Sequence, residues 1–234
     1  MTVDVRRSRE RFHTELDWLD SWHSFSFGTH YDPANTGHGL LIVNNDDVVA
    51  PGTGFATHGH RDMEIVTWVL DGVLEHRDST GTVDRIYPGL AQRMSAGMGI
   101  RHSEMNASAD EPVHLVQMWV LPDTPGIEPG YEQRDIRDSL GDDGLVPVAS
   151  GRGHDGAISI RQSDAVLWAG QLGAGRRVEL PDAPHAHVFV ARGAAELGGA
   201  GQLDTGDAAR LTNAGALALT AAADGAEVLV WETA

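Results

Sequence analysis

The chain of 234 residues contains no cysteine and no lysine. Without cysteine, disulfide bonds and thiolate metal ligands are excluded, which fits a protein of the reducing cytoplasm. All 17 basic residues are arginine, and they face 34 acidic residues, so the formal net charge is −17. This excess of negative charge disfavours direct binding to nucleic acids or anionic membranes, because proteins that bind these partners carry basic patches.

Long apolar segments are also missing from the sequence. No run of residues is long and apolar enough to cross a membrane as a helix. The arginines near the first residue (Arg6, Arg7, Arg9 and Arg11) are not followed by an apolar stretch, so we expect a solvated arm there and no secretory signal. With 41% hydrophobic residues, the chain can bury a substantial core. We therefore expect a globular, cytoplasmic protein, and we expect it to be a monomer.

What the sequence does contain is a series of short strand-like segments separated by glycine and proline turns. Residues 64–70 and 113–121 are rich in β-branched and aromatic residues, which favour strands. Residues 44–47, with the sequence Asn-Asn-Asp-Asp, separate two apolar segments and are interpreted as a hairpin turn. Few stretches have helical periodicity. Together these features predict an all-β barrel or sandwich.

The strand-like segments come in two series, one ending at residue 121 and one beginning at residue 157. The stretch between them is rich in proline, glycine and acidic residues, as a linker would be. The repetition predicts two β-barrels related by duplication. We place an N-terminal domain at residues 1–130, a linker at 131–145 and a C-terminal domain at 146–234.

Two pairs of metal-binding residue types stand out in the first series. His58 and His60 are two residues apart, and so are His102 and Glu104. In a strand, residues two apart point to the same face, so each pair presents both side chains on one side. If the two strands face each other inside a barrel, three imidazoles and one carboxylate converge. This donor set suits iron, and also zinc, copper, nickel or manganese, so we predict a site for one divalent metal.

The second series contains a similar pair, His185 and His187, at the position that His58 and His60 occupy in the first. No histidine or glutamate that could complete the pair follows in residues 208–223. We therefore expect these two imidazoles to be structural or vestigial, since lone imidazoles more often form hydrogen bonds than bind metals. The C-terminal domain is predicted to lack a metal.

Strand parity gives an expectation for the pocket beside the metal. If His60 points inward and no bulge intervenes, Glu64, Val66 and Trp68 point to the same side. An apolar cavity with few polar groups suits a flat aromatic substrate. The alternative is that Val66 and Trp68 belong to the barrel core. Glu64 is either a hydrogen-bond partner that orients a ligating imidazole or a simple exposed or turn carboxylate.

Several motifs resemble those of one known family, the pirins, closely over residues 14–135 and loosely over the remainder. The matching motifs are residues 24–28, 45–47, 51–55, 58–67, 72, 74–76, 78–79, 88–89, 92–97, 99–100 and 102–104. Two positions depart from the family pattern. Gly59 stands where proline is usual, which loosens the backbone but leaves the histidines unchanged. Leu90 stands where aspartate is usual.

The resemblance implies a fold and a metal site. Pirins are bicupins, so we expect two stacked double-stranded β-helix (jelly-roll) barrels, with a metal in the N-terminal barrel only. The resemblance also implies that His58, His60, His102 and Glu104 match the family's ligands residue for residue. The metal that it implies is usually Fe(II), and other divalent transition metals also suit these ligands.

The resemblance further implies an activity. Some pirins open the flavonol quercetin with dioxygen, which would make this chain a quercetin 2,3-dioxygenase acting on a small aromatic, flavonol-like substrate and O2. A metal lowers the pKa of a coordinated hydroxyl, and Glu104 is the candidate base that removes its proton. The family also includes regulatory proteins. The alternative is therefore a non-enzymatic, redox-sensing metal protein that binds a protein partner, and the same four ligands serve both functions.

Overall fold

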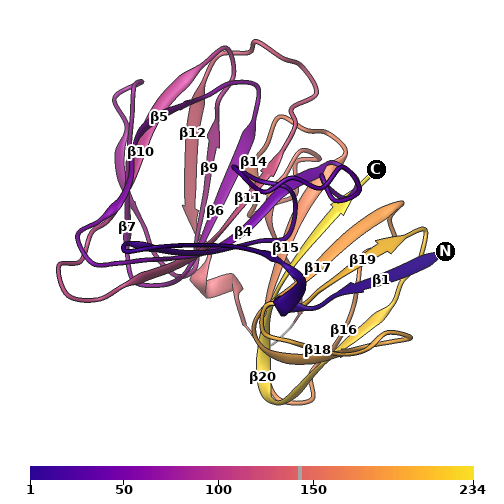
Figure 1. Ribbon diagram of the computed structural model, residues 1–234. Coiled ribbons are helices and arrows are strands. Elements are labelled where there is room, and N and C mark those ends of the chain that lie inside the picture. Colours follow the sequence, from indigo (N-terminus) through magenta and orange to yellow (C-terminus); the bar gives the residue numbers. More distant parts are fainter. Residues whose placement is uncertain (142–143) are drawn as a thin grey trace.

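The computed structural model describes residues 1–141 and 144–234 (Figure 1). These residues form 20 strands in three sheets, with two 3-10 helices of three residues each, η1 (Ser8–Glu10) and η2 (Arg137–Ser139). The prediction of an all-β protein is confirmed. Residues 142 and 143 of the predicted linker lie outside the described residues. Across the described ranges, no helix has the length and apolar character needed to cross a membrane.

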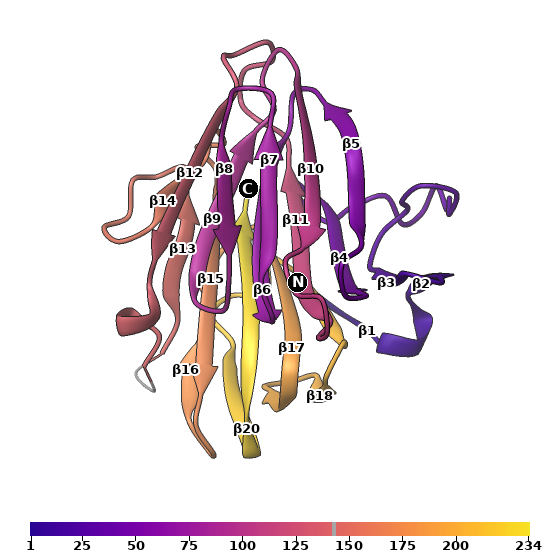
Figure 2. The same cartoon turned by 90° about the vertical axis from the view of Figure 1, so that its left-hand side faces the viewer.

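Two antiparallel sheets make up the N-terminal half and face each other across an interior space (Figures 1 and 2). The seven-stranded sheet has the order β12-β9-β6-β11-β4-β3-β2, and the four-stranded sheet has the order β5-β10-β7-β8. The bounds are β2 (Phe12–Leu16), β3 (Leu19–His23), β4 (Leu41–Val49), β5 (Gly54–His60), β6 (Glu64–Asp71), β7 (Leu74–Asp78), β8 (Val83–Ile86), β9 (Leu90–Ser95), β10 (Ile100–Asn106), β11 (Val113–Val120) and β12 (Gly130–Asp135).

The third sheet has nine strands and contains the C-terminal half. Its main order is β1-β19-β17-β20-β15-β13-β14, while β16 pairs with β20 and β18 with β17. The bounds are β1 (Thr2–Arg6), β13 (Val146–Ser150), β14 (Ile158–Ser159), β15 (Ala165–Leu172), β16 (Arg177–Glu179), β17 (His185–Leu197), β18 (Gly201–Asp204), β19 (Ala208–Thr212) and β20 (Ala218–Thr233).

The predicted division into residues 1–130, 131–145 and 146–234 stays a prediction. The pairing of two strands bears on where the boundaries between the domains lie. The first strand of the chain, β1, pairs with β19 of the nine-stranded sheet, with Thr2 opposite Thr212, and lies beside it in Figure 1. The strand β12, most of which falls in the predicted linker, pairs with β9 of the seven-stranded sheet.

The predicted hairpin turn at residues 44–47 is wrong, because β4 runs without interruption from Leu41 to Val49. Within it, Asn45 lies opposite His23 on β3 and opposite Gln117 on β11. Asn45 and Asp47 line a cavity between the two N-terminal sheets. Their polarity therefore reflects a polar cavity wall rather than a chain reversal.

The seven-stranded sheet is the middle layer of the molecule, as the alternation along β6 shows. Val66 and Trp68 pack in a core shared with the C-terminal half, together with Phe189, Leu229 and Trp231 among others. Ile65 and Val69 belong instead to cores within the N-terminal half. Trp68 also donates a hydrogen bond of 2.9 Å from Nε1 to Oε1 of Glu227 on β20. One face of the middle sheet thus meets the C-terminal half, and the other faces the interior of the N-terminal half.

The expectation that Glu64, Val66 and Trp68 line the pocket is therefore wrong. Parity is lost between β5 and β6, because residues 61–63 lie outside both strands and Asp62 has a left-handed φ of 51°. Glu64 does not orient an imidazole, and it is not an exposed or turn carboxylate, because it lies fully buried at the start of β6. Its Oε2 accepts hydrogen bonds from Ser95 Oγ at 2.8 Å and from the backbone N–H of Arg161 at 3.0 Å. This carboxylate connects the two halves of the chain.

Candidate metal centre

The two strands that carry the predicted ligands, β5 and β10, are antiparallel neighbours (Figure 2). In their register, His58 lies opposite His102. A register shift follows His102, so that Glu104 lies opposite Phe55. His102 and Glu104 are buried, whereas Ser103 and Met105 are only partly buried. The alternation along β10 therefore directs His102 and Glu104 into the interior, as their spacing predicts.

The structure brings three of the predicted ligands together. His58, His60 and His102 each offer a ring nitrogen, and these atoms lie within 4.8 Å of one another. The Nε2 atoms of His58 and His102 are 3.1 Å apart. Two nitrogen ligands at about 2.1 Å from one ion lie about 3.0 Å apart when they subtend a right angle at it. The observed separation therefore fits two ligands of a single ion.

The hydrogen bonds of these imidazoles show which nitrogen atoms face the candidate metal position. His58 donates from Nδ1 to the carbonyl oxygen of Ala56 at 2.8 Å, so its Nε2 is the atom that faces Nε2 of His102. Nε2 of His60 is buried, and within the described part of the chain it has no hydrogen-bond partner. A buried polar atom without a partner is uncommon and calls for a ligand. These residues therefore fit a metal ion.

The protonation states of the histidines also suit metal binding. Burial lowers the pKa of His60 to about 4, and the neighbouring imidazoles of His102 and His58 act in the same direction. Burial lowers the pKa of His102 to about 3, again with help from neighbouring imidazoles, those of His58 and His76. Both side chains are therefore neutral at neutral pH, which is the form that coordinates a metal.

Glu104 lies beside this triad in a second, overlapping cluster. One of its oxygens lies within 4.8 Å of nitrogen atoms of His102 and His76. Gln117 donates from Nε2 to Oε2 of Glu104 at 2.9 Å, and Thr67 donates from Oγ1 to Oε1 at 3.5 Å. The carboxylate is thus held from the opposite sheet. That His58, His60, His102 and Glu104 form one ligand set stays a prediction.

The sequence did not indicate His76 as a metal ligand, and the structure places its ring next to that of His102. Its side chain is fully buried, and its ring centroid lies 5.3 Å from that of His102. Its Nε2 lies 3.2 Å from Oδ2 of Asp78. His76 precedes Asp78 by two residues on β7, a spacing that places both side chains on the same face.

A cavity of about 500 Å³ is lined in part by His58, His60 and Glu104. Its apolar walls are formed by Trp18, Leu19, Phe27, Phe55, Ala56 and Trp119. Its polar walls away from the predicted ligands include Thr14, Ser21, His23, Asn45, Asp47 and Gln117. Trp119 contacts His60 edge-on, with ring centroids 4.9 Å apart. The cavity therefore joins the candidate metal position to a space whose wall includes the aromatic side chains of Trp18, Phe27, Phe55 and Trp119.

The sequence interpretation missed a row of polar residues across the inner face of the seven-stranded sheet. The register of five adjacent strands places, in order, His23, Asn45, Gln117, Thr67 and Gln92 opposite one another. Thr67 and Gln117 are the members that contact Glu104. Their signal in the sequence is a single polar residue inside an otherwise apolar strand, which in a buried strand requires a polar partner.

The second histidine pair lies on β17. His187 is fully buried, burial places its pKa well below the ordinary value, and neither ring nitrogen has a partner in the described ranges. Nδ1 of His185 donates to the carbonyl oxygen of Ala234 at 2.8 Å. Among the described residues, neither belongs to a cluster of three or more metal-binding side chains. That the C-terminal half lacks a metal stays a prediction.

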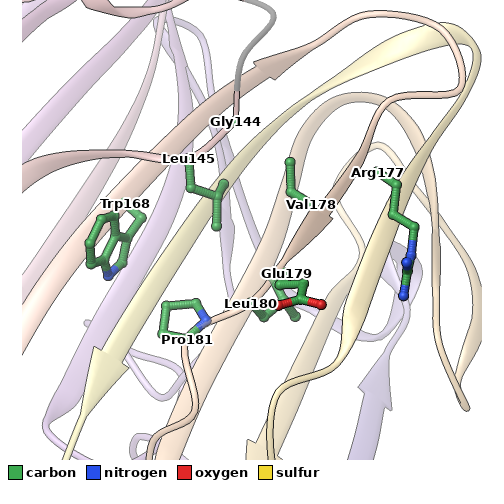
Figure 3. Close-up of a pocket in the computed structure, with 8 residues that line it drawn as sticks. All are labelled: Gly144, Leu145, Trp168, Arg177, Val178, Glu179, Leu180 and Pro181. Atoms are coloured by element: carbon green, nitrogen blue, oxygen red, sulfur yellow. The ribbon is translucent and has the colours of Figure 1, made fainter.

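A hollow of about 470 Å³ on the C-terminal half has a different character. Figure 3 shows Trp168, Leu145 and Pro181 toward one side of it and Arg177 toward the other. Among the described residues that line this hollow there is no histidine, and one residue, Glu179, is acidic. This hollow therefore lacks the donor set of the N-terminal cavity.

Comparison with known proteins shows the family and the fold. Residues 3–120 match the profile of the family described as Pirin, and residues 147–233 match the quercetinase C-terminal cupin domain. A Mycobacterium tuberculosis H37Rv protein, provisionally named a quercetin 2,3-dioxygenase, is 57% identical over 232 residues, which are 99% of this chain and 95% of that protein. The quercetin 2,3-dioxygenase of Escherichia coli K12 is 46% identical over 168 residues, which are 71% of each chain.

Among solved structures, the bacterial pirin YhhW from Escherichia coli in complex with nickel(II) matches with a TM-score of 0.91 and 37% identity. The match covers 99% of both chains. Together with the two profile matches, this structural likeness confirms the predicted fold of two cupin domains.

Proposed function

Because the chain belongs to the pirin family, we propose that it is a metal-dependent dioxygenase that opens the ring of a flavonol-like substrate with O2. One observation carries this proposal. The nitrogen atoms of His58, His60 and His102 converge at the wall of a cavity of about 500 Å³. Aromatic side chains form much of the rest of that wall, and such a space suits a flat aromatic molecule.

The proposed cofactor is one divalent ion, Fe(II) in the cell, held by His58, His60, His102 and Glu104. Three imidazoles and one carboxylate are donors that iron, nickel and manganese accept. The nickel(II) complex of the related bacterial pirin supports a divalent ion. When bound, the ion would act as a Lewis acid that lowers the pKa of a coordinated substrate hydroxyl.

The side chains of this chain have separate tasks in the proposed reaction. Glu104 accepts the proton of the substrate hydroxyl, as a carboxylate at the end of the cavity can. Thr67 and Gln117 hold its two oxygens in place before that transfer. Phe27 and Trp119, which meet edge-on with centroids 5.5 Å apart, provide an apolar wall against which the substrate ring packs and from which water is displaced.

The test is oxygen consumption with quercetin under air, measured for the wild-type protein and for Glu104→Ala at equal metal content. The wild type should consume oxygen, and Glu104→Ala should be slower by about 100-fold or more. Glu111→Ala, which changes an exposed glutamate, is the matched control and should retain the wild-type rate.

Two outcomes would contradict the proposal. The first is an unchanged rate in Glu104→Ala. The second is the absence of turnover by the wild type after loading with iron, nickel, cobalt and manganese in turn, which would favour a regulatory metal protein that binds a protein partner.

A further inference from the structure

One wall of the cavity carries two polar side chains to which the proposed reaction assigns no task. Asn45 and Asp47 are two residues apart on β4, so both point to the same face of the strand, and both line the cavity. Each is only 4% exposed. Polar groups that are buried this deeply need hydrogen-bond partners. Their neighbours in the wall supply a partner for one atom of each side chain.

The carboxylate of Asp47 is held by a serine on the neighbouring strand. Ser21 on β3 lies opposite Asp47 and donates a hydrogen bond from Oγ to Oδ1 of Asp47. Burial raises the pKa of Asp47 to about 7, and the hydrogen bond from Ser21 acts in the opposite direction. At a pH above this value, Oδ2 of Asp47 is an acceptor that remains for the contents of the cavity.

The amide of Asn45 is held by a histidine. Nδ1 of His23 lies 2.9 Å from Oδ1 of Asn45, and because a carbonyl oxygen only accepts, Nδ1 carries the proton. On the other side of the ring, Oγ1 of Thr14 lies 2.9 Å from Nε2 of His23 and can donate to it. Burial lowers the pKa of His23, which favours this neutral form. The imidazole therefore fixes the amide, and Nδ2 of Asn45 is a donor that remains for the contents of the cavity.

We propose that Asn45 and Asp47, the hydroxyl-binding pair, bind a phenolic hydroxyl of the substrate other than the hydroxyl that ionises at the metal. A phenol both donates and accepts a hydrogen bond. Its proton is donated to Oδ2 of Asp47, and its oxygen accepts from Nδ2 of Asn45. The substrate class is therefore an aromatic hydroxyketone with at least one further ring hydroxyl. The proposal deepens the proposed function and rests on it, because it names the substrate class of the same site.

The position of the pair allows one flat molecule to reach both the pair and the candidate base. Asn45 lies opposite Gln117 on the neighbouring strand β11, and Gln117 donates to Glu104. Facing residues on paired antiparallel strands have Cα atoms about 4.5–5.5 Å apart. The pair therefore lies one strand away from the side chain that holds Glu104. The charge of Glu104 also acts on Asp47.

The surroundings of the pair make it selective. When a flat ring fills the cavity, water is displaced from the wall. A ring without a suitable hydroxyl then leaves Nδ2 of Asn45 and Oδ2 of Asp47 without partners, which should weaken binding by about 10- to 100-fold. Without the pair, the apolar walls would favour the less hydroxylated ring, because burying a hydroxyl without a partner is unfavourable. A preference for the more hydroxylated ring therefore indicates that the pair is used.

The first test measures binding and requires neither metal nor turnover. The probes are quercetin and 3-hydroxyflavone, which share the hydroxyketone and differ in the further ring hydroxyls. In isothermal titration calorimetry of the metal-free, full-length wild type at pH 8, quercetin should bind at least about tenfold more tightly than 3-hydroxyflavone. Equal affinities, tighter binding of 3-hydroxyflavone, or no binding of quercetin would overturn the proposal.

Two substitutions assign this preference to the pair. Asp47→Asn and Asn45→Asp change the shape of the side chain little, and each retains an Oδ1 that accepts from Ser21 or His23. The first replaces the acceptor on the cavity wall with a donor, and the second replaces the donor with an acceptor. Each should reduce the preference for quercetin to about threefold or less.

The double variant Asn45→Asp/Asp47→Asn again presents one donor and one acceptor, and it should recover the wild-type preference to within about threefold. A purely structural role for the two residues does not predict this recovery. Asp110→Asn makes the same exchange at an exposed carboxylate and should retain the wild-type preference. An unchanged preference in either single variant, or no recovery in the double variant, would overturn the assignment.

The failures of the two proposals are distinguishable. In the metal-loaded protein under air, the ratio of kcat/KM for quercetin to that for 3-hydroxyflavone should follow the same order among the variants. If the wild type turns over both compounds and binds them equally well, the hydroxyl-binding pair is wrong and the dioxygenase function is unaffected. If the wild type prefers quercetin in calorimetry but turns over neither compound with any metal, the pair binds phenols and the proposed function is wrong.

Discussion

Gln117 on the seven-stranded sheet donates a hydrogen bond of 2.9 Å from Nε2 to Oε2 of Glu104 on the four-stranded sheet. The amide orientation follows from its other partner, because Oε1 of Gln117 accepts a hydrogen bond of 3.0 Å from Nε1 of Trp119. Trp119 in turn contacts the ring of His60. One amide thus links the candidate base, an aromatic wall of the cavity and a predicted metal ligand.

Replacing this amide with an apolar group should loosen the site without removing a ligand. We expect Gln117→Leu to lower metal affinity or turnover by about 10–100-fold, as is typical for groups that orient ligands. Competition with a chelator measures the affinity, and oxygen uptake measures the turnover. Gln171→Leu on β15, where the glutamine is exposed, is the matched control. Equal affinities and rates for the two variants would show that Gln117 does not orient Glu104.

Metal content should depend on the histidines of the N-terminal half and not on the second histidine pair. His102→Ala should lose the ion, because it removes the imidazole whose Nε2 lies 3.1 Å from that of His58. His185→Ala, which alters the second pair, should retain about one equivalent by elemental analysis. Added metal at about 100 times its Kd should stabilise the wild type by about 2.7 kcal/mol and should not stabilise His102→Ala. Equal metal-induced shifts in Tm for the wild type and His102→Ala would contradict the assignment.

The pKa of Asp47 predicts how stability varies with pH. Burial raises this pKa to about 7 in the folded protein, from an ordinary value of 3.8. The folded state then binds a proton that the unfolded state releases between these pH values, so the free energy of unfolding falls as the pH rises from about 4 to 7.

Asp47→Asn removes this titration. Between about pH 4 and pH 8, the free energy of unfolding of the metal-free wild type should fall by up to about 4 kcal/mol more than that of the variant. Urea unfolding at a series of pH values measures the difference. Parallel pH profiles for the two proteins would mean that folding does not raise the pKa of Asp47.

How much of the site can be predicted from sequence depends on how far each inference extends along the chain. The spacing of His58 and His60, and that of His102 and Glu104, lies within single strands, and these side chains do face the interior. The inference from His60 to Val66 crosses residues 61–63, where the left-handed Asp62 reverses the parity. The sequence does not indicate this left-handed conformation, because the residue that adopts it is an aspartate and not a glycine.

Other features of the fold could not be predicted from the sequence, for physical reasons. Asn45 and Asp47 have the composition of a turn, and only the presence of a cavity explains them as strand residues. The pairing of β1 with β19 joins segments about 200 residues apart. Because the two strands pair through backbone hydrogen bonds, the sequence of β1 does not indicate which strand is its partner. The polar row across the middle sheet depends on strand order and register, which emerge only when the sheet is assembled.

The close approach of β5 to β10 predicts opposite effects for two glycine substitutions. At Gly54, an added Cβ would overlap the carbonyl oxygen of Glu104 and lie 2.7 Å from Cα of Met105. Because both neighbours are backbone atoms, β5 would have to move away from β10 beside Glu104. We expect Gly54→Ala to destabilise the protein by about 1–3 kcal/mol and to weaken metal binding.

At Gly59, between the two histidines, an added Cβ would meet no atom closer than the carbonyl oxygen of Ile100 at 3.6 Å. Gly59→Ala should therefore leave stability unchanged or raise it by about 0.4–1 kcal/mol, because alanine restricts the unfolded chain more than glycine does. Urea unfolding and metal titration of both variants separate the two cases. Similar stability and metal affinity in Gly54→Ala and Gly59→Ala would mean that β5 can shift without disturbing the site, and that the tight packing at Gly54 does not hold Glu104 in position.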